Sequence, residues 1–178
     1  MTILLLPGIN NSGPDHWQSL WEEVESDMKR FQPADWDRPR LEDWLATLER
    51  TVADTPGPCL LVAHSLACLL VAHWAERTQR KVKGALLVAV PDPSGPAFPV
   101  EARTFGPLPT GRLPWPSLIV ASSNDPYGSL PHARHCAETW GAGLVEIGPY
   151  GHINGAHGLG RWEEGRRLLT AFATGIGA

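Results

Sequence analysis

The sequence contains few cysteines and no long apolar run. Its three cysteines, Cys59, Cys68 and Cys136, cannot all pair, and none lies in a CxxC arrangement. This spacing disfavours both a disulfide framework and a structural zinc site. No apolar stretch approaches the roughly 20 residues that cross a bilayer, so we expect no membrane-spanning segment. Residues 1–8 lack the basic segment and cleavage site of a secretory leader, so we expect a cytoplasmic protein.

The chain also lacks a strong charge of either sign. Lys and Arg number 15 against 19 Asp and Glu, which gives a formal net charge of −4 without any block of like charge. Domains that bind nucleic acid usually carry a basic patch, so we expect no nucleic-acid partner. A length of 178 residues with 43% hydrophobic residues suits one globular domain with a sizeable core. We therefore predict a single domain over residues 1–178.

Short apolar runs alternate with segments of helical spacing along the chain. Strand-length apolar runs occupy residues 3–6, 59–63, 85–90, 118–121 and 144–147, with a weaker candidate at 28–32. Apolar residues with helical spacing occupy 17–24, 41–52, 130–140 and 162–172. Strands that alternate with amphipathic helices need crossover connections, which make the sheet mostly parallel. The pattern predicts a three-layer α/β domain of about six strands.

Prolines concentrate in residues 91–116, which contain eight of them. Proline restricts the conformations of a loop. This loop leaves the carboxyl end of a predicted strand, the edge at which α/β folds bind ligands. We interpret it as a wall of a site or a small lid. The aromatic residues Phe98, Phe105, Trp115 and Tyr127 either line an acyl pocket or pack the loop against the body.

An apolar strand passes directly into an apolar helix at Ser65, within residues 62–68. A sharp turn of this kind, the nucleophile elbow, exposes a reactive serine and needs small residues two positions before and after it. Ala63 and Ala67 occupy these positions, where glycine is usual. A serine at the start of a helix is also an ordinary N-cap. The motif alone leaves both interpretations open.

The remainder of the chain offers partners for this serine. Asp125 follows the strand at 118–121, and His152 follows the strand at 144–147. The order Ser, acid, His is that of α/β-hydrolases, and all three residues fall at the same sheet edge. Asp92, after the preceding strand, is an alternative acid. His157 is an alternative base, but His152 lies nearer its strand end.

Acyl transfer also needs donors for the oxyanion. The backbone N–H of Leu66, at the start of the helix after Ser65, is one expected donor. Gly8 allows a close backbone approach after the first strand, so the amide of Ile9 is the expected second donor, with Asn10 next.

Other residues near these motifs have weaker assignments. We expect Asn10, Asn11 and Tyr127 to contact substrate, although Asn11 and Ser12 are also suited to cap a helix beginning near Pro14. His64 precedes Ser65 and points to the opposite face of its strand, so we expect it to support the site rather than act as the base. Cys68 is expected to be buried packing.

Two apparent ligand motifs fail on their residue types. Gly8 and Gly13 have the spacing of a phosphate loop, but Pro14 and Asp15 stand where Lys and Ser or Thr are needed. His132 and His135 lack the HExxH pattern of a zinc helix. We therefore expect neither a nucleotide nor a metal.

Several stretches spread over nearly the whole chain form a recognisable set. They are 5–8 with Trp17 and Trp21, 61–66, 121–126, 140–141, and 151–154 with Gly158, Gly160, Trp162 and Gly165. In these stretches the chain resembles the small α/β-hydrolases grouped with the retinoblastoma-binding serine hydrolase and its bacterial relatives. This resemblance implies a serine hydrolase without a large cap, with esterase or amidase activity on small substrates and no cofactor. It also implies that Ser65, Asp125 and His152 are the nucleophile, acid and base.

One departure from that family limits what is carried over. The retinoblastoma-pocket motif is Leu-x-Cys-x-Glu, and here Leu66 and Cys68 are followed by Leu70 in place of Glu. We therefore expect no retinoblastoma-type partner. The sequence predicts a serine hydrolase that forms an acyl-enzyme with small ester or amide substrates. The alternatives are a non-catalytic binding module on the same fold and a flavodoxin-like regulator, which leaves Ser65 and His152 without a role.

Overall fold

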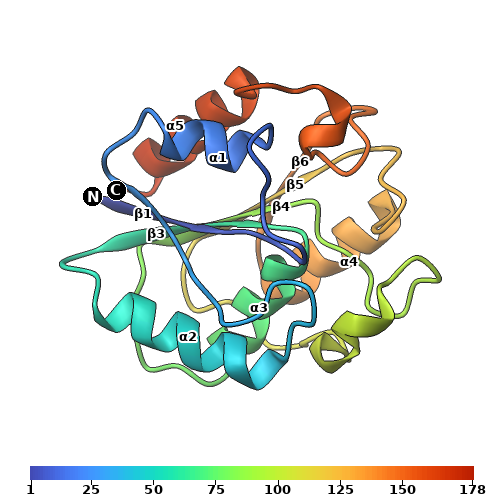
Figure 1. The fold of residues 1–178 in the computed structure, drawn as a ribbon, viewed down its shortest axis with the longest axis horizontal. Helices are drawn as coiled ribbons and strands as arrows, with labels where there is room; N and C mark the ends of the chain where they lie inside the picture. The colour runs from blue at the N-terminus through green and yellow to red at the C-terminus, as the bar shows by residue number, and fades with distance from the viewer.

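Six short segments, most of them apolar, pair as one parallel sheet in the computed structural model, which describes residues 1–178 (Figure 1). The spatial order is β2-β1-β3-β4-β5-β6, and every neighbouring pair is parallel. The chain leaves β1 for β2 on one side and then returns to β3 on the other. Ligands bind α/β sheets where the strand order reverses in this way. The strands are β1 (Thr2–Leu6), β2 (Met28–Arg30), β3 (Cys59–His64), β4 (Gly84–Val88), β5 (Ser117–Ala121) and β6 (Gly143–Glu146).

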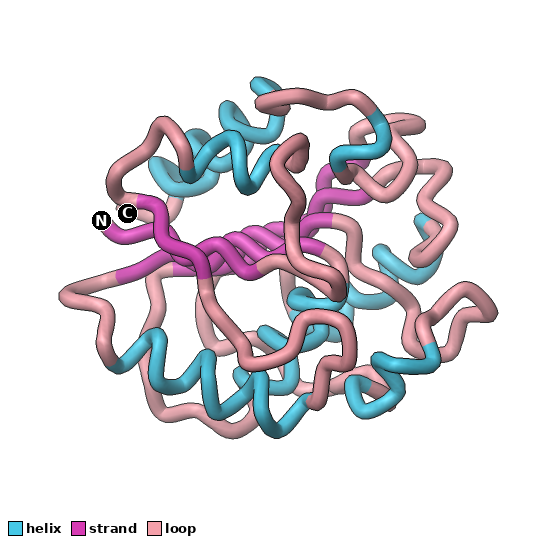
Figure 2. The backbone as a smooth tube through the Cα atoms, in the orientation of Figure 1, coloured by secondary structure: helices cyan, strands magenta, loops and turns pink.

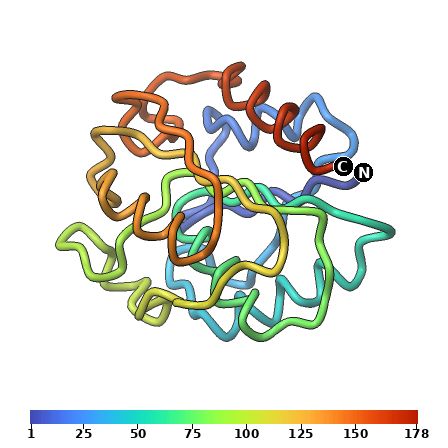
Figure 3. The backbone as a smooth tube through the Cα atoms, turned by 180° about the vertical axis from the view of Figure 1, so that it is seen from behind, coloured from blue at the N-terminus to red at the C-terminus, as the bar shows by residue number.

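Five α-helices form two layers around the sheet, as Figure 2 shows with the strands in the middle. Helices α1 and α5 cover one face, and α2, α3 and α4 cover the other. Seen from behind in Figure 3, the two termini lie close together at one end of the sheet. The helices are α1 (Trp17–Glu22), α2 (Leu41–Ala53), α3 (Leu66–Ala75), α4 (Leu130–Trp140) and α5 (Glu163–Gly175). The predicted three-layer α/β architecture is confirmed.

The sheet carries a hydrophobic core on each face because alternate strand residues point to opposite sides. In β1, Leu4 and Leu6 join a cluster of 32 buried residues that includes the α2 and α3 side chains. Ile3 and Leu5 join a cluster of 14 buried residues that includes Trp17, Trp21 and Leu169 from α1 and α5. Burial on both faces explains why the central strands are continuous apolar runs.

Three details differ from the sequence prediction. The helix expected to begin near Pro14 begins at Trp17, and His16 is its N-cap. The fourth strand ends at Val88, because Ala89 has a left-handed φ of 58° that breaks the extended conformation. The proline-rich segment is not wholly irregular, since Val100–Phe105 forms the 3₁₀ helix η1 with Phe105 fully buried.

Among the helices, none combines the length and the apolarity that a membrane crossing requires.

Candidate active site

Ser65 stands at the junction of β3 and α3 with backbone angles of φ 56° and ψ −124°. A positive φ is uncommon for a residue with a side chain, and such strain tends to occur at functional sites. Gly8, after β1, lies directly against this turn. A Cβ atom at position 8 would sit 2.9 Å from the Cβ of Ser65, so only glycine allows this approach. The loop after β1 therefore packs onto the turn that presents Ser65.

The structure brings Ser65, His152 and Asp125 into one chain of hydrogen bonds. The Oγ of Ser65 lies 2.7 Å from Nε2 of His152. Both carboxylate oxygens of Asp125 lie 2.9 Å from Nδ1 of the same imidazole. The side chain of Asp125 is only 2% exposed, which shields this ion-dipole contact from water. In this arrangement Nδ1 carries the proton, and Nε2 is left free to accept the hydroxyl proton of Ser65.

The alternative acid and base lie in other networks. An oxygen of Asp92 accepts from the backbone N–H of Ser94, and its other oxygen is 3.9 Å from Nδ1 of His132. His157 is exposed, and its Nδ1 lies 2.9 Å from Oδ1 of Asn154. The structure therefore does not connect either residue to Ser65.

The amides expected to bind an oxyanion border the same cavity. Ile9 and Leu66 both line it, and the amide of Ile9 donates no hydrogen bond within the protein. Leu66 is the first residue of α3, where backbone N–H groups have no partner inside the helix. The amide of Asn10 instead donates to the carbonyl of Trp36 at 2.9 Å, so it is already engaged.

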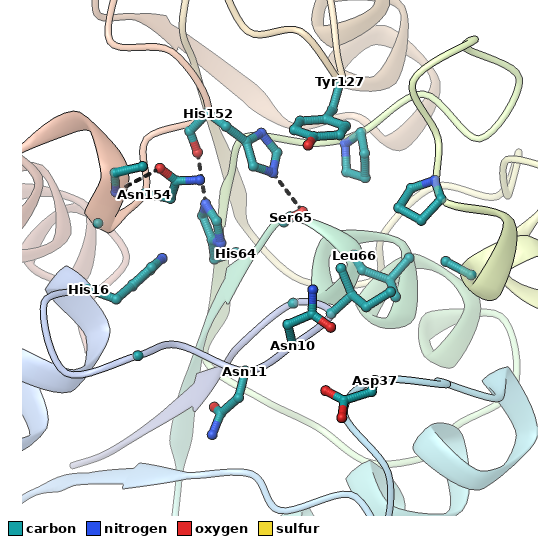
Figure 4. Close-up of a pocket in the computed structure, with 18 of the residues that line it drawn as sticks. Asn10, Asn11, His16, Asp37, His64, Ser65, Leu66, Tyr127, His152 and Asn154 are labelled. Atoms are coloured by element: carbon teal, nitrogen blue, oxygen red, sulfur yellow. Dashed lines mark hydrogen bonds between the residues drawn. The ribbon is translucent and has the colours of Figure 1, made fainter.

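A cavity of about 780 Å³ opens in front of Ser65 (Figure 4). Asn10, Asn11 and Tyr127 all line it, and the Tyr127 ring centroid is 4.6 Å from that of His152. Oδ1 of Asn11 also accepts from the backbone N–H of Ser12 and from the Arg30 guanidinium. The capping role considered for Asn11 and Ser12 is therefore wrong, because His16 takes it.

The proline-rich segment forms one wall of this cavity. Its lining residues are Pro91, Phe98, Pro99, Glu101 and Ala102. The aromatic residues divide between the two roles considered for them. Phe98 and Tyr127 line the cavity, whereas Phe105 and Trp115 belong to the buried core.

The loop that carries His152 is tied to the loop that carries Asp125. Oγ of Ser122 accepts from the backbone N–H of Tyr150 at 2.9 Å. Oδ1 of Asn124 accepts from the backbone N–H of Gly151 at 2.7 Å and from Ser122 at 2.9 Å. Sequence reasoning missed this link. Its only local signal is the run of short polar residues that precedes Asp125.

Two further side chains hold the next peptides of the same loop. Nε2 of His64 lies 2.9 Å from the carbonyl oxygen of His152, which can only accept, so this nitrogen carries the proton. The indole N–H of Trp17 donates to the carbonyl of Ile153 at 2.8 Å. Four consecutive residues, 150–153, are thus each held by a side chain from another part of the fold.

His16, His64 and His152 lie in a row beside the cavity. Ring centroids are 4.7 Å apart for His16 and His64 and 5.0 Å apart for His64 and His152. Burial lowers the pKa of His16 to about 3, with smaller contributions from Arg30 and His152. Burial likewise lowers the pKa of His64 far below its usual range. Both imidazoles are therefore neutral at ordinary pH.

Charged and metal-binding groups around the site are few. The lining residues with charged side chains other than histidine are Asp15, Asp37 and Glu101, and neither Lys nor Arg lines the cavity. No three His, Cys, Asp or Glu side chains are grouped so as to hold a metal ion. Cys68 is fully buried, and burial raises the pKa of its thiol well above the usual range. A protonated thiol is a poor nucleophile.

The parallel sheet and the strand-to-helix turn at Ser65 define an α/β-hydrolase-like fold without a large cap. A family model described as serine hydrolase matches residues 3–171 of the chain. The chain therefore belongs to the serine hydrolase family, and it is a hydrolase.

Individual relatives agree with this assignment. YdeN of Bacillus subtilis (strain 168) is 26% identical in an alignment of 164 positions that covers 85% of each chain. The crystal structure of a YdeN-like protein from Pectobacterium atrosepticum SCRI1043 has a TM-score of 0.88 with 32% identity, covering 98% of this chain and 91% of the other. The structure of the Bacillus subtilis ydeN product has a TM-score of 0.80 with 22% identity, covering 97% and 98%, and shares the fold.

Proposed function

We propose that the protein cleaves small ester or amide substrates through an acyl-enzyme, with carboxylic esters as its main substrates. The observation that carries this proposal is the hydrogen-bonded chain from Ser65 through His152 to Asp125 at a strained strand-to-helix turn. A serine hydroxyl needs a base within hydrogen-bond reach, and that base needs a fixed tautomer. Both requirements are met at the edge of an open cavity.

The reaction proceeds in two stages. Ser65 Oγ attacks the acyl carbonyl while Nε2 of His152 takes its proton, and the amides of Ile9 and Leu66 stabilise the oxyanion. His152 then returns the proton to the leaving alcohol or amine as the carbonyl–leaving group bond breaks. A water molecule, activated by His152 in the same way, releases the acid and regenerates Ser65. Asp125 holds His152 in the required tautomer throughout.

The volume and the lining of the cavity support small substrates. Its volume of about 780 Å³ is ample for a small-molecule acyl substrate, and its lining includes only six hydrophobic residues among 22. Long acyl chains need an extended apolar channel, which this lining does not supply. Short esters and amides therefore suit the site better than lipids.

A fluorophosphonate probe tests the proposal directly. Wild-type protein is expected to gain one adduct, mapped to Ser65 by peptide mass spectrometry, and Ser65→Ala to gain none. Ser123→Ala is the matched control, because Ser123 is exposed and lies outside the cavity lining. Loss of a triad residue lowers kcat by on the order of 10⁴-fold or more, so Ser65→Ala should also abolish hydrolysis of p-nitrophenyl acetate. Folded wild-type protein that takes up no probe and hydrolyses no ester would instead favour a non-catalytic binding module.

A further inference from the structure

Arg30 is a largely buried arginine that lies outside the catalytic cavity. It is the last residue of the edge strand β2, its side chain is 10% exposed, and it does not line the cavity in front of Ser65. Nε of its guanidinium donates to Oε2 of Glu22 at 2.8 Å. Each N–H of a desolvated guanidinium needs an acceptor, and one carboxylate serves only part of the group. The other acceptors of Arg30 therefore indicate what it holds in place.

Those acceptors belong to α1 and to the loop after β1. Nη1 of Arg30 donates to Oδ1 of Asn11 at 3.0 Å and to the carbonyl oxygen of Ser12 at 3.0 Å. Nη2 donates to Oγ of Ser19 at 2.7 Å, and this hydroxyl donates to the same Ser12 carbonyl at 2.9 Å. The guanidinium thus joins two consecutive residues of the loop to α1.

The backbone that Arg30 holds has an unusual conformation. Asn10 and Asn11 both have left-handed φ angles, of 64° and 62°. Left-handed backbone is costly for residues with side chains, and it persists where the surrounding structure fixes it. The amide of Asn10 donates to the carbonyl of Trp36 at 2.9 Å, and the side chain of Asn11 accepts from Arg30. Each of the two residues is therefore anchored to another segment of the chain.

Asn11 in turn holds the peptide unit that carries an expected oxyanion donor. Its backbone N–H donates to the carbonyl oxygen of Gly8 at 3.2 Å, which closes a turn around Ile9 and Asn10. The carbonyl of Gly8 and the N–H of Ile9 belong to one trans peptide, so they point in opposite directions. A hydrogen bond that fixes this carbonyl therefore also fixes the direction of the N–H. The N–H of Ile9 has no acceptor within the protein, and Ile9 lines the cavity.

We infer that Arg30 is a positioning residue for acyl transfer. From outside the cavity it holds the turn of residues 8–11, and this turn directs the N–H of Ile9 toward the oxyanion. The inference rests on the proposed function, because it assumes that Ser65 attacks an acyl carbonyl. Oxyanion donors are effective because they are aligned before the charge develops. Loosening the turn therefore weakens binding of the transition state, whereas binding of the ground-state substrate changes little.

Arg30→Lys tests this role without removing the positive charge. The lysine ammonium can still pair with Glu22, but it lacks the planar fork that reaches the loop and α1 together. Arg166→Lys is the matched control. Arg166 is a half-buried arginine that pairs with Glu25 at 3.0 Å, has no hydrogen bond to the loop after β1, and does not line the cavity.

Asn11→Gly is a second variant, which removes the acceptor side chain from the other end of the contact. Glycine adopts a φ of 62° without strain, so this variant should fold even where a change at Arg30 does not. In Figure 4 the carboxamide of Asn11 points away from Ser65, so its loss leaves the nucleophile itself untouched. Far-UV circular dichroism and urea unfolding monitor the fold of every variant.

The kinetic readout is a pair of esters that differ in the atom bound by the oxyanion donors. p-Nitrophenyl acetate has a carbonyl oxygen, and O-(p-nitrophenyl) thioacetate has sulfur in its place. Sulfur is larger and accepts hydrogen bonds more weakly, so well-aligned donors favour the oxygen ester. Enzyme in excess over the thiono ester makes even a slow reaction measurable.

Arg30→Lys should lower kcat for p-nitrophenyl acetate by about 10- to 100-fold with little change in KM, because loss of an entire oxyanion donor costs roughly 10²- to 10³-fold. The ratio of kcat/KM for the oxygen ester to that for the sulfur ester should fall by about 10-fold from its wild-type value. Asn11→Gly should lower the same ratio by a smaller factor. Arg166→Lys should keep the wild-type ratio and kcat.

A purely structural role of Arg30 predicts a different result. Misplacement of Ser65 or His152, or partial unfolding, slows both esters alike and leaves their ratio at the wild-type value. That outcome, or an unchanged kcat in Arg30→Lys, overturns the inference while the proposed function stands. If Arg30→Lys does not fold, a wild-type ratio in Asn11→Gly overturns it in the same way. If wild type hydrolyses no ester and Ser65 takes up no fluorophosphonate, the proposed function fails first, and the inference fails with it.

Discussion

The imidazole of His64 is 2.9 Å from the carbonyl oxygen of His152, so the residue that precedes Ser65 holds the peptide of its hydrogen-bonding partner. Ser65 faces the cavity while His64 points to the other side of the chain and reaches the loop after β6. Strand β3 therefore positions both the hydroxyl and the loop that carries the imidazole. His64 is buried, and the desolvation of its ring lowers its pKa well below the usual range, so it is a neutral donor at ordinary pH and only a weak base.

This contact predicts a kinetic effect of His64 variants. His64→Ala removes the donor to the His152 carbonyl, so the imidazole is less well placed and kcat should fall by up to about 100-fold. KM should change little, because His64 acts through the position of His152. His64→Gln, which keeps a distal N–H donor, should recover part of kcat. Steady-state kinetics with p-nitrophenyl acetate measures both constants, and equal losses in the two variants would contradict a positioning role.

The two candidate acids make a second prediction. Asp125→Asn should lower kcat by on the order of 10⁴-fold, because an amide cannot hold His152 in the tautomer that accepts the serine proton. Asp92→Asn should stay near wild type, since Asp92 pairs with His132 at 3.9 Å and its side chain is 37% exposed. Hydrolysis rates of the two variants, together with far-UV circular dichroism, make the comparison. A larger loss in Asp92→Asn would reverse the assignment.

The sequence alone points to these three residues because each depends on one local rule. Ser65 directly follows an apolar strand, Asp125 and His152 lie on the loops after two others, and parallel strands bring their carboxyl ends to one edge. The position of His16 as the N-cap of α1 could not be predicted in this way. Residues 15–16 pack against Gly155, where an added Cβ would lie 3.2 Å from the carbonyl oxygen of Asp15. This contact joins distant parts of the chain, so the local preference of Pro14 for a helix start did not decide where α1 begins.

The side chains that hold the His152 loop were unpredictable for the same reason. Ser122 and Asn124 look like ordinary turn residues in the sequence. Their side-chain oxygens accept from the backbone N–H groups of Tyr150 and Gly151, and these groups come within reach only when β5 and β6 pair. Hydrogen bonds to a backbone on another loop have no periodicity that a pattern could reveal. They are nevertheless what fixes the distance between the predicted acid and base.

The close approach of Gly8 to Ser65 yields a third prediction. Gly8→Ala would place a Cβ 2.9 Å from the Cβ of Ser65 and 3.2 Å from the carbonyl of His64. Relief of this overlap must move the turn or the loop, so we expect a loss of about 1–3 kcal/mol in the free energy of unfolding and a fall in kcat. Gly175→Ala is the matched control, because a Cβ there meets nothing within 4 Å. Urea unfolding and ester hydrolysis of both variants test this prediction. A Gly8→Ala variant with wild-type stability and activity would show that the loop after β1 does not pack tightly against Ser65.

The neutral histidines make a prediction about pH and stability. A histidine in the unfolded chain has a pKa of about 6.5 and is protonated below that pH. In the folded protein the pKa of His16 is about 3, so the ring stays neutral down to about that pH. Between these values the unfolded state binds more protons, so stability falls as the pH falls through this window. From pH 7 to pH 5 this single group should lower the free energy of unfolding by about 2 kcal/mol. The lowered pKa of His64 acts in the same direction.

Urea unfolding of wild type, His16→Asn and His135→Gln at pH 7 and pH 5 measures this effect. His16→Asn lacks the titrating ring, so its loss of stability between the two pH values should be smaller than that of wild type by about 2 kcal/mol. His135 is exposed, and its replacement should leave the wild-type dependence unchanged. An equal loss in wild type and His16→Asn would mean that His16 is protonated in the folded protein near pH 6.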